Sequence, residues 1–84
     1  MNIIDYSKLR SLTAREFVRA LLKDGFYLHR QTGSHRHYKH QDGRRVTVSF
    51  HHSGDIFSTK ILEIMIEDQA KWVEDDLKRL NLLK

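Results

Sequence analysis

His35 stands at the start of a strongly basic stretch that runs from Gly33 to Val48. An imidazole takes up and releases a proton near neutral pH, so a histidine suits general acid–base chemistry. The cations around it, against the single negative charge of Asp42, are Arg30, Arg36, Lys39, Arg44 and Arg45. Positive charge at this density favours a partner that carries phosphates. The stretch therefore predicts an acid–base group held against a polyanion.

The same stretch is predicted to form a β-hairpin. Asp42-Gly43 is a turn signal, and residues 35–40 and 44–50 on either side contain strand formers. In the second run, apolar Val46, Val48 and Phe50 alternate with polar residues, which indicates a strand with one buried face.

The length of the turn decides which way His35 points. A two-residue turn would bury Lys39 and two histidines on the apolar face. A three-residue turn, with Gly43 in the left-handed conformation, pairs Tyr38 with Val46 on the core side instead. The cost of burying charge favours this second register, although it turns Arg36 inward, where its long stem has to reach out to solvent. The open side then carries His35 and His37, beside Ser49 and Thr47.

The remaining elements are predicted from caps and periodicity. Thr13-Ala14-Arg15-Glu16 has the spacing of a capping box, and Gly25 can end the helix that follows. A strand over 26–30 leads into the hairpin. Ser58 or Thr59 can start another helix. Its side toward the sheet is expected to carry Ile61, Leu62, Met65, Ile66 and Trp72. Residues 73–80 form either a short extra helix or the end of one long helix. The order is α-β-β-β-α(-α), an α+β fold with the helices on one face of the sheet.

Length and composition limit the possibilities. A chain of 84 residues is expected to form one domain over 1–84, with a core of about 12–72 and a helical extension of about 73–84. It is too small for a deep cavity. The net charge of +4 is uneven, because residues 1–60 carry eleven Lys/Arg against five Asp/Glu. There is no cysteine, no apolar run long enough for a membrane span, and no secretion signal, so the cytoplasm is the expected compartment.

The motif Gly33-Ser34-His35-x-x-Tyr38-x-His40-x-Asp42-Gly43-Arg44-Arg45-Val46-Thr47-Val48 resembles the HicA family of toxin–antitoxin ribonucleases. The resemblance covers roughly residues 12–66. It implies a fold like that of the double-stranded-RNA-binding domain, cleavage of mRNA by a single histidine, and inhibition by a HicB antitoxin. Carried over to this chain, the catalytic histidine is His35, and Gly33 and Ser34 shape its loop. The RNA-binding residues are expected to be Arg30, Ser34, Arg36, Lys39, Arg44 and Arg45.

Several histidines raise the alternative of a metal site. Zinc needs closely converging ligands, whereas these histidines fall on different faces and strand ends with no cysteine nearby, so neither a metal nor another cofactor is expected. His29, His37 and His40 are predicted to be solvated strand residues. His52 either helps to bind RNA or orders the turn after the third strand.

The sequence thus predicts a metal-independent endoribonuclease that acts on mRNA and pairs with a HicB-like antitoxin. One alternative is a non-catalytic RNA-binding module on the same fold, which would bind without turnover. The other is an interaction protein whose basic face only docks an acidic partner, and this version predicts no affinity for RNA.

Overall fold

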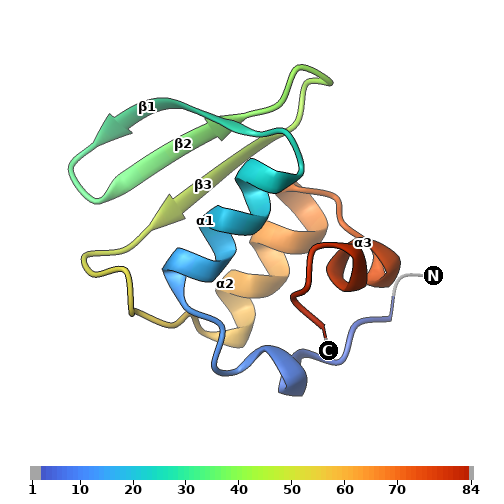
Figure 1. Cartoon of the computed structure of the whole chain (residues 1–84). Coiled ribbons are helices and arrows are strands. Elements are labelled where there is room, and N and C mark those ends of the chain that lie inside the picture. Colours follow the sequence, from blue (N-terminus) through green and yellow to red (C-terminus); the bar gives the residue numbers. More distant parts are fainter. Residues whose placement is uncertain (1–2, 84) are drawn as a thin grey trace.

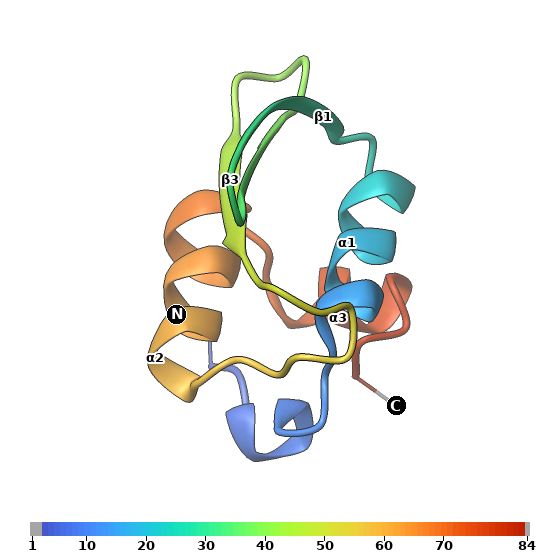
Figure 2. The same ribbon diagram turned by 90° about the vertical axis from the view of Figure 1, so that its left-hand side faces the viewer.

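The computed structural model describes residues 3–83 of an α+β protein, with a short 3-10 helix and an α-helix before a three-stranded antiparallel sheet and further helices after it (Figure 1). The sheet forms one end of the molecule, and its hairpin turn projects away from the helices (Figure 2). None of the helices within residues 3–83 is long and apolar enough to cross a membrane. The elements are η1 (Tyr6–Leu9), α1 (Ala14–Lys23), β1 (Tyr27–Thr32), β2 (His35–Lys39), β3 (Arg45–Ser49), α2 (Thr59–Glu63), the π-helical η2 (Ile64–Gln69) and α3 (Glu74–Arg79).

Both ends of α1 are where the sequence predicts them. The Thr13 side chain accepts from the Glu16 amide, and the Glu16 carboxylate accepts from the Thr13 amide, so the capping box is complete. At the other end Gly25 has a φ of +99°, which a residue with a Cβ rarely adopts. The Phe26 amide donates to the Leu21 carbonyl and the Gly25 amide to the Leu22 carbonyl, which is the Schellman pattern of a terminated helix.

The sheet has the strand order β1-β2-β3, and its hairpin has the predicted register. Tyr38 pairs with Val46, and both are buried in the core. The turn between β2 and β3 is the three-residue type, with Gly43 at a φ of +100° and its amide donating to the His40 carbonyl. In β1 a bulge at His29 shifts the pairing between Leu28 and Arg30.

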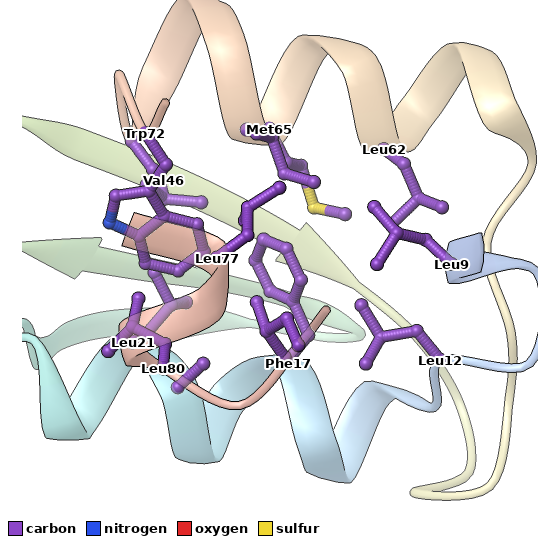
Figure 3. Packing of buried hydrophobic residues seen from close by; sticks show 14 of the residues in the cluster. Leu9, Leu12, Phe17, Leu21, Val46, Leu62, Met65, Trp72, Leu77 and Leu80 are labelled. Atoms are coloured by element: carbon purple, nitrogen blue, oxygen red, sulfur yellow. The ribbon is translucent and has the colours of Figure 1, made fainter. Parts of the chain in front are cut away.

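The core lies between the helices and one face of the sheet (Figure 3). Phe17 and Leu21 of α1, Leu62 of α2 and Met65 of η2 are all fully buried. Ile61, which was expected to face the sheet, is 45% exposed, so that prediction is wrong.

The C-terminal part forms a short extra helix and not the end of one long helix. Lys71 takes a left-handed φ of 58° and breaks the helix after η2. Trp72 is therefore beyond the helix, where its ring packs against Phe17 at 5.5 Å and Phe26 at 6.4 Å between ring centroids. Leu77 and Leu80 from the α3 region join the same core.

Asp24, at the end of α1, connects three parts of the chain. Its carboxylate accepts from the Trp72 indole at 2.8 Å and from Arg79 at 2.9 Å, and it pairs with Arg44 at 3.1 Å. The Arg44 guanidinium also pairs with Asp42, donates to the Ala70 carbonyl at 2.7 Å and lies over the Phe26 ring. These bonds hold the turn end of the hairpin and the C-terminal segment against α1.

Arg44 and Arg45 are neighbours with different surroundings, which allows a matched test. Arg44→Ala removes a guanidinium that satisfies two carboxylates and a carbonyl, so it should lower the free energy of unfolding by about 2 kcal/mol. Arg45 is exposed, and Arg45→Ala should change the free energy of unfolding by less than about 0.5 kcal/mol. Urea unfolding measures both, and equal losses would contradict this division of roles.

Asp24 should make stability sensitive to acid. Burial by itself raises the pKa of Asp24, but hydrogen bonds from Trp72 and Arg79 and the Arg44 charge outweigh it and hold the pKa below its ordinary value of 3.8. The stabilisation is then complete above that value and is lost as the pH falls through the lower folded-state pKa. Asp24→Asn should therefore destabilise the protein at neutral pH and lose less stability than the parent as the pH falls below 3.8. Parallel pH profiles for the two proteins would show that Asp24 is not responsible.

Candidate functional site

The register of the sheet creates one face that the helices do not cover, here called the open face. Its residues lie in three rows across the strands, because paired residues point to the same side. The rows are Thr32–His35–Ser49, Arg30–His37–Thr47 and Tyr27–Lys39–Arg45. The expected placement of His35 beside Ser49 and of His37 beside Thr47 is confirmed.

His35 is exposed at the first position of β2. The loop before it turns at Gly33, which has a φ of +59° and whose carbonyl accepts from the Gln31 side chain at 3.1 Å. Ser34 ties the loop to β3, since its carbonyl accepts from the Phe50 amide at 3.2 Å and its hydroxyl is 3.4 Å from that of Ser49. Within residues 3–83 nothing hydrogen-bonds to the His35 ring. The loop is thus fixed while the imidazole stays available to a ligand.

Positive charge gathers on the open face beside His35. Arg30, Lys39 and Arg45 contribute it from three different strands. The pKa of His29, in the β1 bulge, is lowered mainly by the charge of Lys39, with smaller effects from desolvation, Arg30 and Arg45. A second proton on that ring is disfavoured by the same field that would attract an anion.

Arg36 and Arg44, both predicted to bind RNA, lie away from the open face. Arg36 points to the core side, as the chosen register requires, and its guanidinium carbon is 4.4 Å from the centre of the Phe50 ring. Arg44 is committed to Asp24, Asp42 and Ala70. An RNA contact by either residue stays a prediction.

His29 is exposed as predicted, but His37 and His40 differ from the predicted solvated residues. His40 is partly buried, and its Nε2 donates to the Asp24 carbonyl at 2.8 Å while its Nδ1 accepts from the Asp42 amide at 3.1 Å. His37 is half-buried, and its Nδ1 is 3.2 Å from the Thr47 hydroxyl. The prediction that both are simply solvated is therefore wrong.

The loop after β3 is ordered by a carboxylate. The amides of His51 and His52 both donate to Asp55 at 3.1 Å. These bonds lower the pKa of Asp55, and the bond from His52 has the larger effect. The side chains of both histidines are exposed. In the part of the chain that the structure describes, no three potential metal ligands gather in one place.

Sequence reasoning missed two features of this site. The predicted register already put His37 next to Thr47, and a side-chain bond across the strands could have been expected from that pair. The bulge at His29 had no signal in the sequence, although it brings Arg30 level with His37 on the open face.

The arrangement combines an exposed imidazole with cations on one surface. An imidazole can transfer a proton to or from a bound phosphodiester, and cations on the same surface attract the phosphates of such a ligand. The surface is open, so the partner can be a long polymer.

Comparison with known proteins gives a family match. A family model described as the HicA toxin of bacterial toxin–antitoxin systems matches residues 14–70, which is more than half of the chain. The match runs from the first residue of α1 to the end of η2 and includes the whole sheet. No curated protein matches the chain. On the family match, together with the α+β order of helix, three antiparallel strands and helices, this chain belongs to the HicA toxin family.

Proposed function

We propose that this HicA toxin is a metal-independent endoribonuclease that cleaves mRNA in the cytoplasm through His35. Membership of the family makes the chain the toxin of a toxin–antitoxin pair and implies a cognate antitoxin. The observation that carries the finer proposal is the position of His35. It is exposed, its loop is tied to β3, and it shares the open face with Arg30, Lys39 and Arg45.

The proposed reaction is the attack of a ribose 2′-hydroxyl on the adjacent phosphate. A bond forms between the 2′-oxygen and phosphorus, and the bond from phosphorus to the 5′-oxygen breaks. His35 takes the proton of the 2′-hydroxyl as general base, and the protonated imidazole then gives a proton to the leaving 5′-oxygen. The products are a 2′,3′-cyclic phosphate and a 5′-hydroxyl end. Imidazole supplies this proton transfer without a metal ion.

The cations of the open face bind the RNA backbone in this proposal. They attract RNA irrespective of its sequence, because each phosphate contact releases counterions. Arg30, Lys39 and Arg45 are the main phosphate ligands, with Ser34 next to His35 as a neutral contact. Arg36 and Arg44 are secondary, because both guanidinium groups already pack within the fold.

We further propose that the antitoxin is HicB-like and covers the open face. An exposed ribonuclease site would harm its own cell unless another surface occludes it. Because the face is positive, the covering surface should present carboxylates to Lys39 and Arg45.

His35→Ala should abolish RNA cleavage and growth arrest together while keeping the fold, because an exposed side chain contributes little packing. His51→Ala is the matched control, since it removes another exposed imidazole and keeps the backbone amide that binds Asp55. Cleavage by purified protein and toxicity on expression are the measurements. An expressed, folded His35→Ala protein that still cleaves RNA would refute the role of His35.

The antitoxin should compete with RNA for the open face. Cleavage titrated with the antitoxin should recover when more RNA is added, and association should slow as salt rises. Hydrogen exchange of the complex should show protection over β2 and β3. Protection confined to α2 and α3, with the hairpin left open, would mean that inhibition is indirect.

A further inference from the structure

The open face has a hollow next to His35 that the proposed reaction does not use. Its volume is about 390 Å³. No acidic residue lines it. Side chains of all three strands form it, and its polar lining is His29, Arg30, His37, Lys39, Arg45 and Thr47.

The three cations of this hollow are not neutralised. Within residues 3–83, Arg30, Lys39 and Arg45 form neither an ion pair nor a side-chain hydrogen bond. Arg44 and Arg79, by contrast, pair with Asp24. Like charges on one surface repel each other, so an anion between them relieves repulsion as well as adding attraction. The lowered pKa of His29 reports that their fields converge there.

His37 gives the hollow an imidazole ring in a fixed orientation. Its Nδ1 is 3.2 Å from the Thr47 hydroxyl, and the half-buried ring keeps its Nε2 for a ligand. A ring held on one nitrogen loses less freedom when it binds than a free side chain does. Three cations and an oriented imidazole can together bind the oxygens of a phosphate group.

The position of the hollow relates it to His35. Along β2, His37 and Lys39 are two and four residues from His35 on the same face. At the rise of an antiparallel strand these separations are about 7 and about 14 Å. A polynucleotide whose scissile phosphate lies at His35 therefore has to pass over the hollow or leave the sheet at once.

We propose that this hollow is a phosphate subsite that binds the RNA backbone next to the scissile bond, so that the strand runs along β2 toward the hairpin turn. The inference rests on the proposed ribonuclease function and adds the path of the substrate. The subsite holds ground state and transition state alike, because the phosphate it binds does not react. Its contribution should therefore appear in KM and not in kcat.

Substrate length provides the test. A dinucleotide has only the phosphate that is cleaved, whereas a longer oligoribonucleotide with the same central sequence also fills the hollow. In the double variant Lys39→Gln/Arg45→Gln, KM for the long substrate should rise about tenfold or more with kcat unchanged. The dinucleotide should be cleaved by the double variant as by the parent. Lys78→Ala, which removes an exposed cation on α3, is the control. It should leave KM and kcat unchanged for both substrates.

If the double variant loses kcat/KM equally for both substrates, or loses activity through kcat alone, the proposed subsite is refuted. Binding gives a second readout that needs no catalysis. A 2′-O-methyl oligonucleotide, which cannot be cleaved, should bind the double variant about tenfold more weakly and with a smaller salt slope. It should also shift the NMR signals of the His37 ring in the parent protein. Unchanged affinity and unchanged His37 signals would refute the subsite, whereas cleavage by His35→Ala would refute the proposed function alone.

Discussion

The whole site depends on the pairing of Tyr38 with Val46 in the hairpin. Side chains alternate along a strand, so a slip by one residue would move every group of β2 to the opposite face. Lys39 and two histidines would then enter the core, at a cost that no partner there could offset. The three-residue turn enforces the correct pairing, because Gly43 takes a φ that residues with a Cβ avoid. The open face is thus a consequence of turn geometry as much as of strand composition.

The basic hairpin divides its cations between folding and binding. Arg44 and Arg45 are adjacent, yet one joins the Asp24 network and the other stays free on the surface. Burial of Arg44 is tolerated because two carboxylates and a carbonyl satisfy its donors, and the Phe26 ring covers its plane. A count of positive charges therefore overstates the binding surface, and only the pairing partners show which cations remain for a ligand.

The open face is not covered by any other part of the described chain, and this limits how its activity can be inhibited. No side chain of the described residues closes over His35, and the fold is too small to bury it. If the proposed function holds, control then has to come from a separate surface that covers the same groups that RNA needs. A basic face serves both partners, because carboxylates and phosphates are recognised by the same donors.

The sequence alone predicts those features of this protein whose interacting residues are close together along the chain. The capping box at Thr13, the helix stop at Gly25, the turn at Gly43 and the register that exposes His35 are all encoded by neighbouring residues, and all are confirmed. The roles of Arg44, His40 and Trp72 were not predictable, since each is decided by Asp24 or its carbonyl, between 16 and 48 positions away. The bulge that turns Arg30 toward His37, and the exposure of Ile61, likewise came only with the folded chain. Local patterns determined which elements form and which face His35 takes, because they depend on backbone geometry and on alternation. Tertiary packing decided which cations remain free to bind, because an ion pair requires partners that only the folded chain brings together.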